Sequence, residues 1–215
     1  MEGINPILKG SVERYLKKSK YPNLEDVCAI LGIGEEEEEA KLDVGDEISF
    51  VLKNGTAIRA FPVKKETDGM LFCSLNCLPE RIAMSESGEC DSYEESDVRK
   101  YLCENVYQAL PENIKESLAP FENGDFLRIP TEKEVFGKNE YGEEEPESVT
   151  QWEPMKRVMN RVAGDSNDEY TVWYWLKNKS KNHSSAFAIA TNTGTATNNG
   201  ASYPFGVRPV FKIKI

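Results

Sequence analysis

Two kinds of side chain in this sequence could carry out covalent chemistry, a lone histidine and a set of cysteines. His183 is the only histidine among the 215 residues, so any Ser-His-Asp or Cys-His mechanism must use it. It lies in an apparent polar loop, with no sequence cue for a carboxylate that would orient its ring. We therefore expect His183 to be an exposed loop histidine rather than a catalytic base.

The cysteines do not form a metal or redox motif. Their number is odd, and none of them has the paired spacing of a zinc site. Cys73 and Cys77 are separated by three residues, which on a strand places both thiols on the same face, as expected for buried structural cysteines. The full set is Cys28, Cys73, Cys77, Cys90 and Cys103.

Motifs that hold metals or phosphates are also absent from the sequence. It contains no Asp-x-Asp-x-Asp-Gly loop and no pair of histidines. Gly32 and Gly34 lack the third glycine of a dinucleotide motif, and the five glutamates that follow would repel a phosphate. We expect no metal site and no cofactor.

Composition excludes further classes of partner. A net charge of −11 disfavours nucleic acids and anionic membrane surfaces, which need clustered Lys and Arg. No apolar run reaches the length of about 18 residues that a spanning helix requires. Residues 1–20 lack the apolar block of a signal peptide. We expect a soluble chain that is cytoplasmic as synthesised, with no membrane insertion.

The elements that must position these residues follow an α+β pattern. Helical periodicity covers much of residues 1–40, where an acidic connector follows two helices. Alternation from residue 46 predicts a β-hairpin that turns at Asn54-Gly55, and a strand over 70–75 comes next. Residues 93–118 predict two helices, with Ser96 as the N-cap of the first.

The second half of the sequence predicts a similar mixture. A strand over 126–129 leads into a capping box from Thr131 to Glu134, and Gly137 ends that short helix. The remaining expected elements are an exposed loop over 138–148, a helix over 152–162, a turn over 192–194, and strands over 172–176, 186–190 and 207–213.

Residues 178–203 have the most unusual composition in the chain. They are rich in Asn, Ser and Thr and poor in acids, although the chain as a whole is acidic. Short amide and hydroxyl side chains recur with Tyr in recognition loops, but they are also common in turns between strands. Composition leaves both interpretations open.

The order of motifs in this region resembles the closing part of a known family. The chain carries Trp173-Tyr174-Trp175-Leu176, Ala186-Phe187-Ala188-Ile189, Thr193-Gly194 and Phe205-Gly206-Val207-Arg208-Pro209-Val210. This series is similar to the C-type-lectin-like fold shared by the formylglycine-generating-enzyme superfamily and the variable proteins of diversity-generating retroelements. Residues 96–102 and 126–134 resemble a related group of uncharacterised bacterial and phage domains with the same Gly-Val-Arg-Pro ending.

The resemblance implies a C-type-lectin-like domain over residues 41–215, built of short antiparallel sheets flanked by helices, with the helical segment 1–40 outside it. Within it we expect Gly206 to allow a tight entry to the last strand, and Pro209 to suit a strand edge or bulge. Arg208 could satisfy buried carbonyls or a carboxylate with its five donors. Trp173 and Trp175 are expected to be core aromatics.

The sequence lacks the residues that each known activity of this fold requires. Members that oxidise sulfatase cysteines use cysteines near the C-terminus, whereas the last one here is Cys103. Iron-dependent relatives use a histidine-rich motif that is missing, and Glu153-Pro154-Met155 only partly imitates the Glu-Pro-Asn motif of calcium lectins. A fold alone does not confer an activity, so we expect no enzyme.

The leading hypothesis is a non-catalytic binding or display domain related to phages or mobile elements, with an unknown protein or carbohydrate as its ligand. One alternative is a structural subunit of a virion or other assembly, which would make the chain oligomeric and virion-associated. Another is a divergent enzyme that uses His183. The predicted ligand-binding residues are Asn178, Asn182, His183, Asn192, Asn198, Asn199 and Tyr203.

Overall fold

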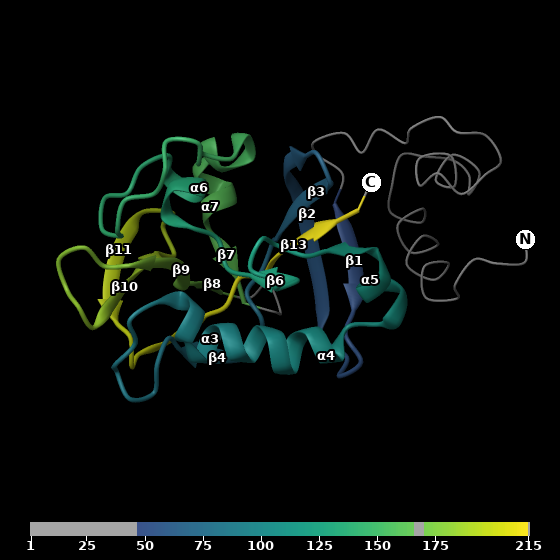
Figure 1. The fold of residues 1–215 in the computed structure, drawn as a ribbon, viewed down its shortest axis with the longest axis horizontal. Coiled ribbons are helices and arrows are strands. Elements are labelled where there is room, and N and C mark those ends of the chain that lie inside the picture. The colour runs from purple at the N-terminus through teal and green to yellow at the C-terminus, as the bar shows by residue number, and fades with distance from the viewer. Residues whose placement is uncertain (1–46, 166–169, 215) are drawn as a thin grey trace, which may run out of the picture.

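The computed structural model describes residues 47–165 and 170–214, in which strands predominate over helices in a mixed α+β arrangement (Figure 1). Two sheets form the two halves of this part, and a helical run extends beneath both in this view. Their strand pairs are antiparallel, apart from the parallel pairing of β12 with β9 in the second sheet. The helices and acidic connector expected within residues 1–40 lie outside the described residues.

The first sheet combines strands from both ends of the described chain. Its order is β1-β2-β3-β13-β5, and β6 pairs with β13 beyond this path. The predicted hairpin is confirmed, since β1 pairs with β2 and Gly55 between them has a φ of +89°. The strands are β1 (Ile48–Val51), β2 (Ala57–Glu66), β3 (Gly69–Ser74), β5 (Leu118–Ala119), β6 (Leu127–Arg128) and β13 (Val210–Ile213).

The second sheet has the order β11-β10-β9-β12-β4, which makes β11 an edge strand. The chain leaves this sheet through β12 and enters the first sheet as β13, so the predicted closing segment links the two halves. The strands are β4 (Arg81–Ala83), β9 (Tyr174–Lys179), β10 (Ala186–Ala190), β11 (Ala196–Gly200) and β12 (Pro204–Gly206), and a separate pair consists of β7 (Ala163–Gly164) and β8 (Thr171–Val172).

The main helical run begins where the sequence predicts. The hydroxyl of Ser96 accepts a hydrogen bond of 3.1 Å from the amide of Arg99, which confirms the N-cap. The middle of the run is π-helical, and Pro111 separates it from the next helix. The helices are η1 (Tyr93–Glu95), α3 (Asp97–Lys100), η2 (Tyr101–Val106), α4 (Tyr107–Ala109) and α5 (Glu112–Ser117).

One local prediction after this run is confirmed and another is wrong. Helix α6 (Glu132–Phe136) has the predicted capping box, and Gly137 ends it with a φ of +77°. The continuous helix predicted over 152–162 is replaced by the 3-10 helix η3 (Glu153–Lys156) and the short helix α7 (Val158–Arg161). Met155 in this segment is buried while Met159 is 81% exposed, so its apolar residues do not share the single face that stabilises a helix.

The central strands β9 and β10 of the second sheet are buried on both faces. Trp175 of β9 and Phe187 of β10 belong to a core shared with the helical run and the first sheet. Their neighbours Tyr174 and Ala188 point the other way, into a second core that contains Trp152. Burial on both faces explains why these strands are continuous apolar runs rather than alternating ones.

Candidate functional site

Asn178, one of the predicted ligand-binding residues, has a structural role instead. Its side-chain oxygen accepts a hydrogen bond of 2.7 Å from the backbone amide of Glu132, at the start of α6. Its amide nitrogen donates to Oε2 of Glu145 over 3.0 Å. Because both ends of the amide are bound within the chain, Asn178 holds the segment after α6 in place and is not a display position.

Asn192 lies apart from the other predicted residues, in the turn between β10 and β11. Its side-chain oxygen accepts a hydrogen bond of 3.0 Å from the indole of Trp173. Trp173 was expected in the core, but it is 39% exposed, and its ring stacks on Phe205 at a centroid distance of 5.9 Å. Trp173 precedes the first residue of β9, so its ring packs at the border of the sheet rather than inside it.

The other five predicted residues gather at the opposite end of β10, and we call them the polar edge. Pairing of Ala186 with Gly200 brings the loop before β10 next to the end of β11. The hydroxyl of Ser180 accepts hydrogen bonds from the backbone amide of Asn182 and the side-chain amide of Asn198, at 3.4 and 3.3 Å. The polar edge consists of Asn182, His183, Asn198, Asn199 and Tyr203.

Exposure varies within the polar edge. Asn182 and His183 are exposed, and Tyr203 is 58% exposed. Asn198 and Asn199 are half-buried on the edge strand β11, and the side chain of Asn199 accepts from the next backbone amide at 2.8 Å. The polar edge therefore offers amide, imidazole and phenol groups to solvent from adjacent segments.

The loop over 138–148 is largely exposed, as the sequence predicts, and a buried carboxylate anchors its first part. Glu132 is fully buried, and its carboxylate accepts hydrogen bonds from the backbone amides of Glu140 at 3.1 Å and Gly142 at 2.7 Å. Burial raises the pKa of Glu132, against the opposing effect of these amides. A side chain at Gly142 would collide with Asn178, since a Cβ there would lie 2.4 Å from that residue's Cβ.

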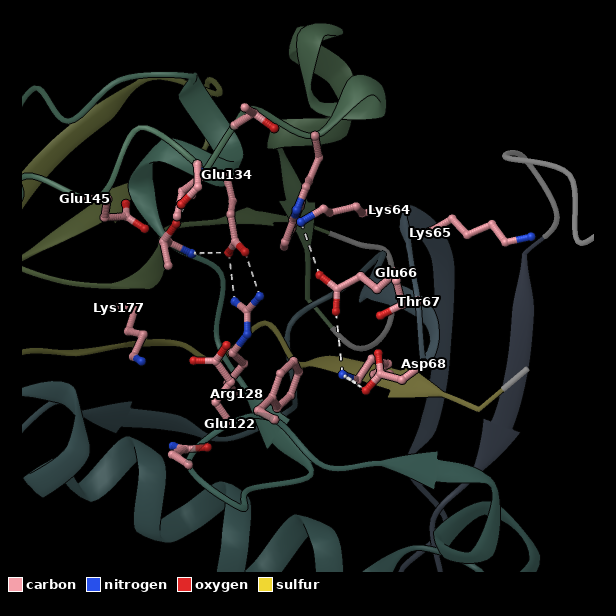
Figure 2. A pocket seen from close by; sticks show the side chains of 18 residues that line it. Lys64, Lys65, Glu66, Thr67, Asp68, Glu122, Arg128, Glu134, Glu145 and Lys177 are labelled. Carbon is pink, nitrogen blue, oxygen red and sulfur yellow. Dashed lines mark hydrogen bonds and ion pairs between the residues drawn. The ribbon is translucent and has the colours of Figure 1, made fainter.

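A cleft of about 1090 Å³ opens beside this anchored loop, and we call it the charged cleft (Figure 2). Its walls come from the β2–β3 turn, the segments 121–123 and 145–152, the start of α6, and single residues of β9 and β13. Its cations are Lys64, Lys65, Arg128, Lys177 and Lys212. Its acids are Glu66, Asp68, Glu122, Glu134 and Glu145.

Arg128 forms the best-defined ion pair of the charged cleft. Its guanidinium donates two hydrogen bonds to the carboxylate of Glu134, at 2.8 and 2.6 Å. It also lies 4.8 Å from the ring centroid of Phe121 and 5.8 Å from that of Trp152. Burial is the largest single influence and opposes ionisation of Arg128, but the charge and the hydrogen bonds of Glu134, with other nearby acidic groups, together outweigh it. The pKa of Arg128 is therefore raised, and the guanidinium stays charged.

Lys212 holds the opposite side of the charged cleft. Only 8% of its side chain is exposed, although it lies within the apolar strand β13. Its ammonium lies 2.6 Å from the carboxylate of Asp68 and 3.6 Å from that of Glu66. The hydrogen bond from Lys212 lowers the pKa of Asp68, so this carboxylate is ionised at neutral pH.

Several polar side chains of the charged cleft have no hydrogen-bond or ion-pair partner among the described residues, and Trp152 and Glu122 are two of them. Trp152 is 2% exposed, and its indole N–H meets no acceptor among residues 47–165 and 170–214. The other two tryptophan indoles each donate a hydrogen bond, Trp173 to Asn192 and Trp175 to the carbonyl of Ile82. Glu122 likewise forms no hydrogen bond or ion pair with any residue that the structure describes.

Arg208 has the structural role that the sequence predicts. It is 1% exposed, and its guanidinium donates to the carbonyls of Ser74 at 2.7 Å and Asn160 at 3.0 Å. The hydroxyl of Tyr174 accepts a third bond at 3.0 Å. Arg208 therefore satisfies buried oxygens of three separate segments, and within the described ranges no carboxylate pairs with it.

The remaining predicted structural residues also lie where strands meet. Trp175 is fully buried, and the carbonyl of buried Pro209 accepts a hydrogen bond of 2.9 Å from the amide of Ser74. A Cβ at Gly206 would lie 2.7 Å from the sulfur of Cys77, so only glycine fits at this position. The tight approach expected there is therefore present.

The thiols within the described chain are poor nucleophiles. Cys73 and Cys77 are buried, as predicted, and burial raises the pKa of Cys77 to about 12. Half-buried Cys103 has its pKa raised to about 11 by desolvation and by the nearby charge of Asp125. Cys28 lies outside the described residues. Each described thiol is protonated near neutral pH.

Sequence reasoning assigned none of the residues of the charged cleft to a functional site. One signal was present, since a lysine inside the apolar run Val210–Ile213 must find acidic partners if that strand is buried. The partners of Lys212 come from the β2–β3 turn, more than a hundred residues earlier, so the sequence could not identify them.

Neither a membrane span nor a metal site stands out in the parts of the chain that the structure covers. No helix within 47–165 and 170–214 is long and apolar enough to cross a bilayer. The same ranges bring together no group of three or more metal-ligating side chains. Comparisons of the chain with models of protein families, with curated proteins and with solved structures gave no match.

Proposed function

We propose that this chain is a non-catalytic binding domain with the C-type-lectin-like fold, which recognises a protein or glycan through the polar edge. Two sheets of mainly antiparallel strands, flanked by short helices, support this fold, because the resemblance implies that architecture. The motifs that carry the resemblance also meet in space, since β9 pairs with both β10 and β12 before the chain enters β13.

One observation carries the choice of surface. Ser180 bonds to Asn182 and Asn198, and so joins two polar segments that are apart in the sequence. His183 lies between these segments and the exposed ring of Tyr203 lies beside them, with no side-chain bond from either to another described residue. Adaptable amides beside a tyrosine are typical of recognition surfaces, where they contact a partner without loss of a bond inside the protein.

The chemistry of the candidate nucleophiles supports a function without catalysis. The imidazole of His183 meets no orienting carboxylate within the described ranges, so no catalytic triad is formed around it there. The described thiols have raised pKa values, which disfavour the reactive thiolate. A divergent enzyme that uses His183 is the less favoured alternative for these reasons.

The decisive experiment is a combined alanine variant of Asn182, His183, Asn199 and Tyr203, tested on a glycan array. We expect the wild type to retain specific glycans and the variant to lose them, with nearly the same melting temperature for both. Asn192→Ala, at the other end of the sheet, is the control and should bind as the wild type does. Full retention by the combined variant would exclude the polar edge as the glycan surface.

A relation to phages or mobile elements is part of the same proposal. Its support is the order of motifs from Trp173 to Arg208, which is similar to the variable proteins of diversity-generating retroelements. Beside the gene, we expect a reverse transcriptase gene and a near-copy of the region that encodes these residues, differing at adenines. Without them the surface would be a fixed one rather than a diversified one.

A second candidate function, a structural subunit of a larger assembly, is favoured by exposed apolar side chains. Val158 and Met159 on α7 are 51% and 81% exposed, and Tyr170 nearby in the chain is 71% exposed. Such groups often mark contact surfaces between protein chains. Size-exclusion chromatography of the purified chain separates the candidates, because self-assembly predicts a discrete oligomer that Met159→Ser weakens.

A further inference from the structure

The charged cleft is a second site, distinct from the polar edge, and it has the properties of a small-molecule site. None of its lining residues belongs to the polar edge. Its volume of about 1090 Å³ lies just above the usual range of ligand pockets, roughly 300–1000 Å³. A few polar groups with unused bonding capacity converge on it, as specific recognition requires.

The cations of the charged cleft differ in how many of their N–H groups already bind acceptors within the protein. Lys212 is held by Asp68, while Arg128 uses its two terminal nitrogens on Glu134 and on a backbone carbonyl. Arg128 has five N–H groups, so its Nε hydrogen and one hydrogen of Nη2 remain unused in these bonds. The same guanidinium can therefore bind an additional acceptor without giving up Glu134.

Lys65 forms no ion pair with a described residue, but Figure 2 shows its side chain directed away from Arg128. Lys177 is the cation near Arg128 that a ligand can recruit most easily. Its ammonium lies 2.8 Å from the carboxylate of Glu94, with 31% and 49% of the two side chains exposed. Pairs this exposed contribute only about 0–1 kcal/mol, so a carboxylate in the charged cleft can compete for the lysine. Figure 2 shows Lys177 and Glu122 on the same side of Arg128, so groups of both signs lie in that part of the cleft.

We propose that the charged cleft binds a small zwitterion of the amino-acid or short-peptide class. Its carboxylate is bound by Arg128, Lys177 and the indole N–H of Trp152, and its ammonium by Glu122. The balance of cations and acids in the lining suits a ligand that carries both charges, in a chain whose net charge is otherwise strongly negative. Binding would also give the indole N–H of Trp152 an acceptor, which no described residue supplies.

Two other ligand classes fit the charged cleft less well. A simple anion would be repelled by the carboxylate of Glu122, which has no cationic partner in the described residues. A sugar that stacks on an aromatic face would find the rings of Phe121 and Trp152 already in contact with the guanidinium of Arg128. Neither class uses the unpaired donor and the unpaired acceptor together.

The proposal is tested by isothermal titration calorimetry of the full chain with triglycine. The comparison ligands are triglycine acetylated at its amino end, triglycine amidated at its carboxyl end, and acetate. We expect triglycine to bind, and each blocked form to bind about tenfold more weakly for the loss of one charge-assisted contact. No binding of triglycine at about 10 mM, or acetate binding as tightly as triglycine, would overturn the proposal.

Two variants test whether triglycine binds in the charged cleft. Glu122→Gln and Trp152→Phe should each weaken triglycine binding by about tenfold, because they remove one charge and one N–H respectively. Glu116→Gln is the control for an exposed glutamate outside the lining and should bind as the wild type does. Trp152 packs in a core, so Glu122→Gln decides the matter if Trp152→Phe unfolds, and unchanged binding by Glu122→Gln would reject the site.

Discussion

The guanidinium of Arg128 and the carboxylate of Glu134 face each other through two hydrogen bonds at the point where β6 leads into α6. Both side chains are largely buried, with 14% and 11% exposed. The carboxylate also accepts from the backbone amide of Thr131, at 2.9 Å, as part of the capping box. One acid thus both begins a helix and neutralises the arginine of the charged cleft.

Glu134→Gln separates these two roles. Glutamine can still cap the amide of Thr131, but it leaves the buried charge of Arg128 without a counter-ion. We expect the free energy of unfolding to fall by about 3 kcal/mol, as for other broken buried pairs. Urea denaturation measures it, and Thr131→Ala, which removes only a cap, should lower the same quantity by about 1 kcal/mol. A loss for Glu134→Gln no greater than that of Thr131→Ala would contradict the prediction.

Glu132 predicts a specific dependence of stability on pH. Burial raises its pKa in the folded chain above the ordinary value of 4.5, so the folded state holds this proton in a range where the unfolded chain has lost it. The contribution of Glu132 to stability is therefore greatest below about pH 4.5 and falls as pH rises through the folded pKa.

The measurement is urea denaturation of the wild type and Glu132→Gln between about pH 4.5 and about pH 7. The stability of the wild type relative to the variant should decrease over this interval, because glutamine cannot ionise. A difference that stays constant, or one that moves in favour of the wild type, would show that the pKa of Glu132 is not raised.

Arg208→Lys tests whether geometry or charge matters at the buried arginine. Lysine keeps the charge, but its single ammonium cannot reproduce the fork that reaches the carbonyls of Ser74 and Asn160 together. We expect a loss of about 2–4 kcal/mol in the free energy of unfolding, since at least one buried oxygen is left without a donor. Equal stability of the two proteins by urea denaturation would show that charge alone is sufficient.

Gly142→Ala tests the anchored loop. The new methyl group would lie 2.4 Å from the Cβ of Asn178 and 2.9 Å from the carboxylate of Glu132, so the loop must shift. We expect a loss of about 1–3 kcal/mol in the free energy of unfolding, as for other overpacked positions. Gly200→Ala is the control, because a Cβ there meets only the ring of Tyr203 at 3.5 Å, an ordinary contact. Similar losses for both variants would reject the steric explanation.

Thiol labelling tests the cysteines. At about pH 8, we expect Cys103 to react at least about tenfold more slowly in the folded chain than in urea, because its raised pKa suppresses the thiolate. Cys73 and Cys77 should react only when the chain unfolds. Peptide mapping by mass spectrometry identifies each labelled residue, and rapid labelling of Cys77 in the folded chain would contradict its burial.

The sequence could predict those features that depend on residues close together in the chain. The hairpin at Asn54-Gly55 and the capping box of Thr131 and Glu134 depend on neighbouring residues, and both are present. The charged cleft depends on contacts between distant segments, such as Lys212 with Asp68, which no local pattern reports. The polar surface was predicted from composition, which could not distinguish the structural amide of Asn178 from the exposed Asn182.

The edge position of β11 has a consequence for how this chain can change over generations. Its inner neighbours β9 and β10 fill both cores with their own side chains, so the stability of the sheet depends little on which residues β11 carries. Replacements at Thr197 or Asn199 alter the outer chemistry while they leave the packed interior as it is, and surface changes of this kind shift stability by only about 0.5 kcal/mol. Packing therefore constrains substitutions on β11 less than it constrains those on β9 or β10.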